Sequence, residues 1–194
     1  MTRLLFLTVL VGAVLHGVAC TESTAVAGPV DEDPLACDLP SEFIVDGGVG
    51  RGGIPTLQNP EFISAEPSIG NVYLKDGDRV VGVVLDGVAM AIPHNILWYH
   101  EIVNLDRGGE EIAITYCPLT GSSMGFDRGS IGGQELGVSG VLFMNNLIMF
   151  NRGDPESLWP QMFGEARCGP QSGQELVRFP AFEMSWSRWK APPR

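Results

Sequence analysis

The chain is predicted to be mainly β (α+β), a single compact domain of antiparallel strands with short helical segments. Its 194 residues include 25 glycines and 14 prolines, so turns must be frequent. The apolar fraction of 44% is too high for wholesale disorder. Short apolar runs bounded by turn residues recur along the chain, which is typical of hairpins. These observations leave open whether the strands form a barrel or a sandwich.

The N-terminus predicts export. Arg3 precedes an apolar run over residues 4–14, the pattern of a secretory signal peptide, here assigned to residues 1–19. Val18-Ala19-Cys20 resembles a bacterial lipobox, although Gly17 stands where leucine is usual. The alternative is cleavage after Ala25-Val26-Ala27, which releases a soluble protein. Because the apolar run ends directly at Cys20, we expect a lipid-anchored protein of the bacterial cell envelope, with no other membrane contact.

A linker and one domain follow the leader. Residues 20–42 are polar, acidic and punctuated by proline, which predicts a flexible linker. Residues 43–190 suffice for one β-rich domain with its own core, and 191–194 form a short tail. The domain opens with an expected strand at 43–45. The glycine-rich loop 47–53 lacks the lysine ending of a P-loop and predicts a flexible surface turn.

The strand pattern becomes regular from residue 72 onward. Residues 72–75 and 79–85 flank Asp76-Gly77-Asp78 as an expected hairpin, and residues 88–92 follow a second turn. Residues 94–99 predict about one helical turn. Asn145-Asn146 is expected to be a turn. A helix is expected at residues 182–189, because Trp186 and Trp189 are three residues apart. The remaining strands are expected at 101–105, 111–116, 123–126, 136–143, 147–151 and 176–179.

The net charge argues against one class of partner, and the number of cysteines limits the possible disulfides. The formal net charge of −11 offers no basic stripe for phosphates, so nucleic-acid binding is not expected. There are four cysteines. If Cys20 carries lipid, one disulfide and one free thiol is the simplest arrangement. A Cys37–Cys168 bridge with Cys117 free suits an exported protein, although spacing alone does not fix the pairing.

The stretch 98–126 holds the residue types best suited to chemistry. Cys117 precedes Pro118 at the end of an expected strand, where a thiol can serve as a nucleophile or a soft metal ligand. His100 is a candidate base, with Glu101 or Asn104 nearby. The alternative is an inert, buried cysteine.

A metal site of copper or zinc is a further hypothesis. Cys117, His100 and His94 are suitable ligands by type, but no tight ligand spacing supports the set. Because His100 and Glu101 are adjacent in an expected strand, they point to opposite faces and are not expected to share one ion. A structural histidine is the alternative for His94.

Several long motifs resemble one bacterial envelope family, catalogued as a domain of unknown function, DUF3179. They are WYHEIVN, ITYCPLTGSSMGFDR, GVSGVLFMNNLIMFNR and ESLWPQMFGEA, in this order, within residues 43–190. The resemblance implies no established reaction. Family members often carry Tyr-Cys-Pro-Leu-Cys-Gly-Thr, but Thr120 replaces the second cysteine here. This departure puts dithiol exchange and a two-thiolate metal site in doubt.

The leading functional hypothesis is an envelope protein that binds a small ligand or soft metal near His100 and Cys117. The second is a cysteine-dependent enzyme with Cys117 as nucleophile, His100 as base and Glu101 in support. The third is a structural or partner-binding module, in which the tryptophans only pack the core. The spacing of the residues does not decide among them.

Overall fold

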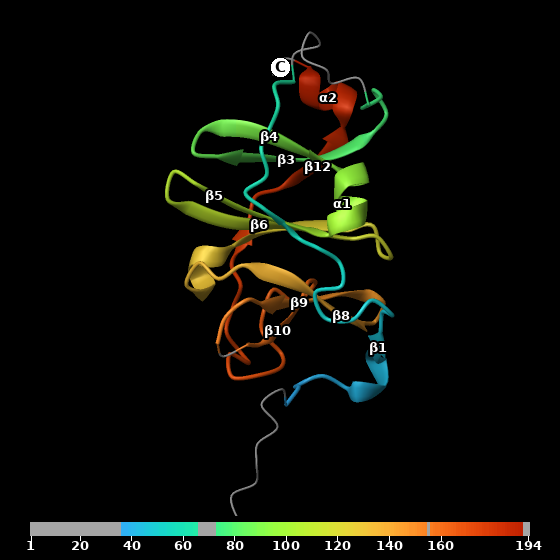
Figure 1. Ribbon diagram of the computed structural model, residues 1–194, viewed down its shortest axis with the longest axis vertical. Coiled ribbons are helices and arrows are strands. Elements are labelled where there is room, and N and C mark those ends of the chain that lie inside the picture. Colours follow the sequence, from blue (N-terminus) through green and yellow to red (C-terminus); the bar gives the residue numbers. More distant parts are fainter. Residues whose placement is uncertain (1–35, 66–72, 155, 192–194) are drawn as a thin grey trace, which may run out of the picture. The chain divides into compact units, whose positions relative to one another are not determined.

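The computed structural model describes residues 36–65, 73–154 and 156–191, all within one unit, Glu32–Arg194. The predicted leader and Cys20 lie outside the described residues. The strands form three sheets, which confirms the prediction of a mainly β fold (Figure 1). None of these sheets closes into a barrel within the described chain, and the arrangement is sandwich-like.

The three sheets are here named A, B and C. Sheet A has the order β1 (Ile44–Asp46), β8 (Leu136–Phe143), β9 (Asn146–Asn151) and β10 (Leu158–Pro160). Sheet B has the order β11 (Arg178–Phe179), β7 (Ser122–Asp127), β6 (Glu110–Cys117), β5 (Ile102–Arg107) and β2 (Leu57–Gln58). Sheet C has the order β12 (Phe182–Ser185), β3 (Arg79–Leu85) and β4 (Val88–Pro93). The helices are α1 (His94–His100), α2 (Trp186–Lys190) and the 3-10 helices η1 (Ser41–Phe43) and η2 (Arg128–Ile131). Of the strand pairs, β2 and β5 run parallel and the others antiparallel.

Sheet B packs on both of its faces, because successive residues of a strand point to opposite sides (Figure 1). Along β6, Ala113 and Cys117 belong to a core shared with sheet A. Ile112, Ile114 and Tyr116 belong to a second core, shared with sheet C. Sheet A supplies Leu136, Val138, Leu147, Met149 and Trp159 to the first core, and sheet C supplies Val81, Val83, Leu85, Met90 and Ile92 to the second. The central strands therefore read as nearly continuous apolar runs.

A buried arginine holds η2 against sheet B. Arg128 is 1% exposed, and its guanidinium donates to the carbonyls of Ile112 (3.0 Å), Gly133 (2.6 Å) and Leu105 (3.4 Å). It also pairs with Asp106. Burial lowers the pKa of Arg128, and the nearby Glu135 opposes this change. The hydrogen bonds compensate for burying this charge.

The glycine-rich loop lies along β8, which differs from the free turn expected from its composition. Gly47 N donates to Gly140 O (2.7 Å), and Gly52 N donates to Val138 O (2.8 Å). Gly140 has φ +85°, and a Cβ there would come within 2.5 Å of the Gly50 backbone. Glycine is needed at this close approach of two backbones.

Two predicted elements near the C-terminal helix were wrong. The expected helix 182–189 begins as β12, and only its second half forms α2. The described residues of the expected strand 72–75 form no strand. Both errors have the same cause. Residues 182–185 pair with β3 as a strand, and they occupy the edge of β3 that residues 72–75 would have used in the expected hairpin.

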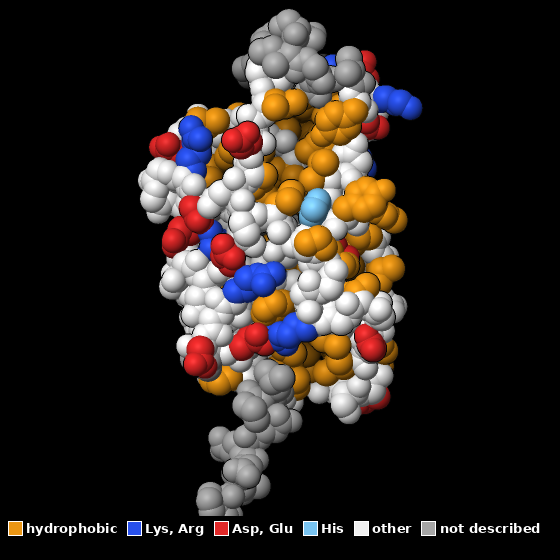
Figure 2. Space-filling model, viewed as in Figure 1, with side chains coloured by type: hydrophobic (Ala, Val, Ile, Leu, Met, Phe, Trp, Pro, Cys, Tyr) orange, Lys and Arg blue, Asp and Glu red, His pale blue; other side chains and the backbone are white. Residues whose placement is uncertain are grey.

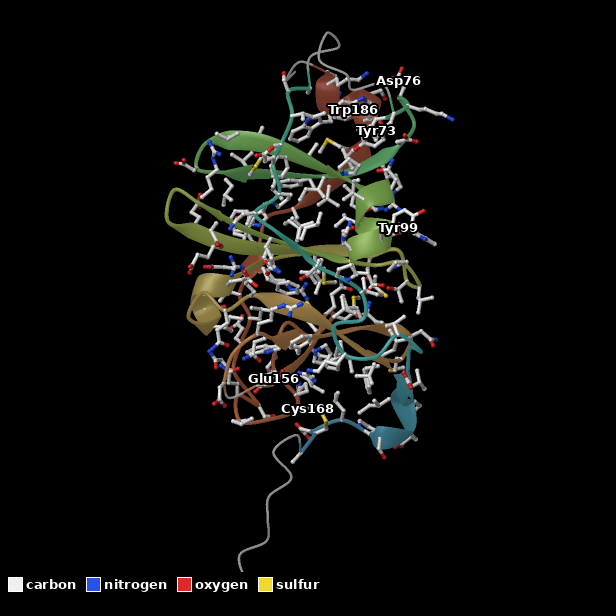
Figure 3. All side chains as sticks on the ribbon, in the orientation of Figure 1. Tyr73, Asp76, Tyr99, Glu156, Cys168 and Trp186 are labelled. Carbon is white, nitrogen blue, oxygen red and sulfur yellow. A yellow bond between two sulfur atoms is a disulfide. The ribbon has the colours of Figure 1, made fainter. Side chains whose placement is uncertain are left out.

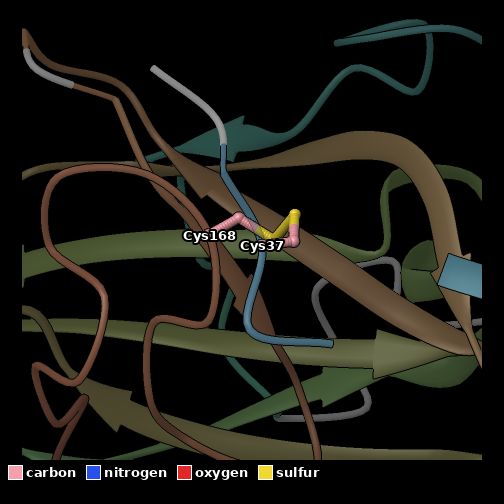
Figure 4. The surroundings of a disulfide bond; sticks show 2 residues. All are labelled: Cys37 and Cys168. Carbon is pink, nitrogen blue, oxygen red and sulfur yellow. A yellow bond between two sulfur atoms is a disulfide. The ribbon is translucent and has the colours of Figure 1, made fainter. Parts of the chain in front are cut away.

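The described part of the predicted linker, residues 36–42, is tied to the domain. Cys37 and Cys168 form a disulfide, and Asp38 N donates to Arg167 O (2.6 Å) (Figure 4). The helices in the described part of the chain lack the length and hydropathy of a transmembrane span.

Candidate functional site

Cys117 lies in the core between sheets A and B. It is the free cysteine among the described residues and is 1% exposed. Its Sγ lies 3.7 Å from the carbonyl oxygen of Asn145, in the turn between β8 and β9. Across the β6–β7 ladder it pairs with Ser122. The thiol therefore packs as a buried apolar group, and a substrate does not reach it in this structure.

His100 and Glu101 lie at the end of α1, not in a strand as expected. His100 Nδ1 is 2.7 Å from the carbonyl oxygen of Pro55. Glu101 caps the helix with φ +55°, and its backbone amide donates to Leu97 O (2.7 Å). Burial raises the pKa of the Glu101 carboxyl to about 7. The positive φ is an uncommon conformation for a residue other than glycine, and burial accounts for the raised pKa. Neither feature by itself assigns a chemical role to Glu101.

His94 faces sheet C. Its ring packs edge-on against Tyr116 with centroids 4.6 Å apart, and its Nε2 lies 3.3 Å from Glu183 Oε1. Burial lowers the pKa of His94, a change that the Glu183 carboxylate opposes and Arg79 reinforces. Tyr116 and Cys117 are neighbours on one strand but contribute to different cores.

The histidines and the thiol are therefore held by separate contacts. Throughout the described chain, no three His, Cys, Asp or Glu side chains form a group that could hold a metal ion. His94, His100 and Cys117 do not form such a group. Asn104, the other suggested helper, is a buried structural amide that bonds both backbone groups of Leu136 at 3.0 Å.

Helix α1 carries two exposed aromatic side chains. Trp98 is 59% exposed and Tyr99 is 72% exposed. Figure 2 shows apolar side chains gathered on this side of the molecule, beside a histidine, and Figure 3 places Tyr99 on α1. The atom of this helix that is buried without a hydrogen-bond partner in the described structure is His94 Nε2, and it lies beside the Glu183 carboxylate.

A small pocket lies beside the turn that joins β6 to β7, and we name it the Asn146 pocket. It has a volume of about 310 Å³. Asn146 is 6% exposed, whereas Met144 (63%), Met162 (56%) and Phe163 (46%) are largely exposed. Pockets that bind small molecules commonly combine apolar walls with a few polar groups. The lining residues are Thr120, Phe143, Met144, Asn146, Pro160, Met162 and Phe163.

A network of amides and hydroxyls lies beneath this pocket. Asn146 Nδ2, with two hydrogens to donate, lies within hydrogen-bond distance of three acceptors: Thr120 Oγ1 (2.9 Å), Ser122 Oγ (3.1 Å) and Gln161 Oε1 (2.9 Å). Gln161, which is fully buried, donates from Nε2 to Thr115 Oγ1 (2.8 Å) and to Ser122 O (3.3 Å). Asn146 Oδ1 is buried and has no hydrogen-bond partner in the described structure. Such an atom needs an explanation, because burying an unpaired acceptor is unfavourable.

The pocket was not predicted from the sequence. The expected turn Asn145-Asn146 is displaced by one residue, because Met144 (φ +49°) and Asn145 (φ +64°) are the two residues at positive φ. This is the pattern of a two-residue hairpin turn. Asn146 therefore begins β9 and is buried, paired with Phe143. Asparagine readily adopts positive φ in turns, so the Asn145-Asn146 pair indicated a turn here. The pair does not specify which of the two asparagines occupies it.

A larger pocket of about 890 Å³ lies on sheet C near Trp186 and Trp189. Ala65 and Tyr73, two of its lining residues, flank residues 66–72, which are not described. None of its lining residues is among the described buried groups that lack a hydrogen-bond partner. The Asn146 pocket therefore carries the more specific chemical signal.

The family model described as protein of unknown function (DUF3179) matches residues 51–192. The chain belongs to the DUF3179 family. The resemblance indicated by the motifs around Cys117 and Trp159 is thus confirmed. No curated protein and no solved structure is detectably similar to this DUF3179 protein. Any activity must therefore be argued from its own residues.

Proposed function

We propose that this DUF3179 protein is an exported protein of the cell envelope that binds a small, mostly apolar ligand in the Asn146 pocket. The sequence led us to expect a site near His100 and Cys117, whereas the site proposed here is built from Asn146 and its neighbours. Export through leader 1–19 and lipid attachment at Cys20 remain part of the proposal. The observation that carries it is the buried, unpaired Asn146 Oδ1 beside a pocket.

The walls support an apolar ligand. Phe143, Pro160 and Phe163 provide rigid surface, and Met144 and Met162 provide flexible thioether side chains that adapt to different shapes. Phe143 and Phe163 are in contact, with ring centroids 5.8 Å apart. The Arg167 guanidinium stacks on Phe163, 4.9 Å from the centroid, which supports that ring from beside the pocket.

Three alternatives have less support. A cysteine nucleophile requires an accessible thiolate, whereas Cys117 is buried and its contact is a backbone carbonyl. The copper or zinc site at His94, His100 and Cys117 stays a prediction, and no three-residue ligand group supports it in the described chain. A purely structural role gives no reason for a pocket beside the unpaired Asn146 Oδ1.

The proposal is tested by methyl NMR on protein labelled with ¹³C at the methionine methyl groups. We use indole and benzofuran as probes, two ring systems of nearly equal size. Saturable shifts of the Met144 and Met162 signals with either probe would support the proposal. Met149, which is fully buried in the core shared by sheets A and B and lines neither pocket, is the internal control and should not shift.

A matched pair of variants locates the binding. Met162→Trp fills the Asn146 pocket and should abolish the Met144 shift. Val84→Trp places the same side chain on β3, at another exposed apolar position (58% exposed), and should leave the shift unchanged. Equal binding by both variants, or no saturable shift with either probe, would count against a ligand in this pocket.

A further inference from the structure

We infer that the ligand of the Asn146 pocket is a neutral, mostly apolar molecule that presents one N–H or O–H donor to Asn146 Oδ1. The inference rests on the proposed function and adds the chemical class of the ligand. It depends on which way the Asn146 side-chain amide points, because its two ends have opposite hydrogen-bonding roles.

The orientation of Gln161 is set by a backbone carbonyl. The Ser122 carbonyl oxygen can only accept, so the Gln161 atom 3.3 Å away must be the donor Nε2. Thr115 agrees, because its hydroxyl donates to Met124 O (3.2 Å) and accepts from the same Nε2 (2.8 Å). Gln161 Oε1 therefore points the other way, toward Asn146.

The orientation of Asn146 follows from that of Gln161. Gln161 Oε1 accepts from Ser122 Oγ (3.0 Å) and from Asn146 Nδ2 (2.9 Å). If the Asn146 amide were reversed, its oxygen would face Gln161 Oε1, and two acceptors would be in contact. Asn146 Nδ2 therefore stays in the network, and Oδ1 remains a fixed acceptor without a partner among the described residues.

The class of ligand follows from this fixed acceptor and from the walls. Oδ1 is buried, so it forgoes hydrogen bonds with bulk water, and a ligand donor restores the missing bond. A ligand that offers only an acceptor brings two acceptors together. No charged side chain belongs to the pocket lining in the described structure, so a charged ligand would lose hydration without compensation.

The methionine side chains can make room for a ligand at Oδ1. Met144 and Met162 are more than half exposed and line the same pocket as Asn146. Methionine is unbranched, with three rotatable bonds, so these side chains can move aside without a change in the backbone. The ligand body then takes their place against Phe143 and Phe163.

The test compares indole with benzofuran, which differ in that an N–H group replaces a ring oxygen. The dissociation constant of each is measured from the Met144 and Met162 methyl shifts. We expect indole to bind about tenfold more tightly, the ratio expected for one hydrogen bond. With ¹⁵N-indole, the N–H proton signal should move downfield on binding, an independent readout of a new hydrogen bond.

Two variants test the role of the acceptor. Asn146→Leu removes the acceptor and should bring the ratio of the two dissociation constants close to one. Val84→Leu, a conservative change at an exposed position on β3 outside the pocket, is the control, and with it the ratio should persist. If Asn146→Leu does not fold, the wild-type ratio and the ¹⁵N-indole signal still decide.

The outcomes distinguish this inference from the proposed function. Equal affinity for indole and benzofuran, with shifts at Met144 and Met162, would overturn the donor inference and leave the binding function standing. Saturable binding of neither probe would overturn both. Tighter binding of benzofuran would show that the Asn146 amide presents Nδ2 instead of Oδ1, which contradicts the inference.

Discussion

Arg128 offers the sharpest test of how this fold is held together. Replacing it with methionine keeps an apolar stem of similar length and removes every guanidinium bond. The carbonyls of Leu105, Ile112 and Gly133 then lose a buried donor. At about 1 kcal/mol for each lost bond, the expected loss is about 3 kcal/mol. Asp106 adds at most about 1 kcal/mol, because its side chain is 45% exposed and stays hydrated.

The assay is equilibrium unfolding in urea at pH 7, with Asp106→Asn as the matched control. Asp106→Asn removes the charge pair and leaves the three carbonyl bonds, so its free energy of unfolding should fall by no more than about 1 kcal/mol. A loss below about 1 kcal/mol for Arg128→Met would refute the reasoning. An equally large loss in both variants would show that the ion pair, not the carbonyl bonds, holds η2.

Three further predictions concern Glu101 and the cysteines. The pKa of Glu101 in the folded protein is about 7, above its ordinary 4.5, so the folded state retains a proton over this interval that the unfolded state releases. The free energy of unfolding should therefore fall as pH rises from 5 to 8. Over this range in urea unfolding, Glu101→Gln should become about 1–2 kcal/mol more stable relative to wild type. If wild type instead became more stable relative to Glu101→Gln as pH rises, the predicted direction would be wrong. Cys117 should resist iodoacetamide in the folded state and react fully in 6 M guanidinium, with Cys117→Ser as control; rapid native labelling would revive the enzyme hypothesis. The double variant Cys37→Ser/Cys168→Ser should lose up to about 5 kcal/mol, because the bridge closes a loop with a sequence separation of 131. Identical unfolding midpoints with and without the bridge would contradict that estimate.

The strands that the sequence predicted well share one property: their pattern is local. Arg79–Leu85 and Val88–Pro93 surround Asp86-Gly87, and the alternation and the turn together specify the hairpin. Leu158–Pro160 was missed because a strand of three residues ending in proline has too few positions to show a period. Phe182–Ser185 was read as helix because its partner β3 lies far away in the sequence.

The candidate site was harder to predict for the same reason. Thr115 lies on β6, Asn146 on β9 and Gln161 directly after β10, and only the stacking of sheets A and B brings them together. His100 and Cys117 looked related because they are close in the sequence. Glu101 has a positive φ at the end of α1, where the chain turns into β5. A glutamate in the sequence does not indicate this backbone conformation.

The sandwiching of sheet B between two cores has a consequence for how the protein comes apart. Because β6 contributes alternate residues to both cores, neither outer sheet can leave without exposing one face of β6 to water. Partial opening is thus penalised whichever side opens first. The amide hydrogens of β6 should consequently exchange with deuterium only when the whole domain unfolds, and they should report its global stability.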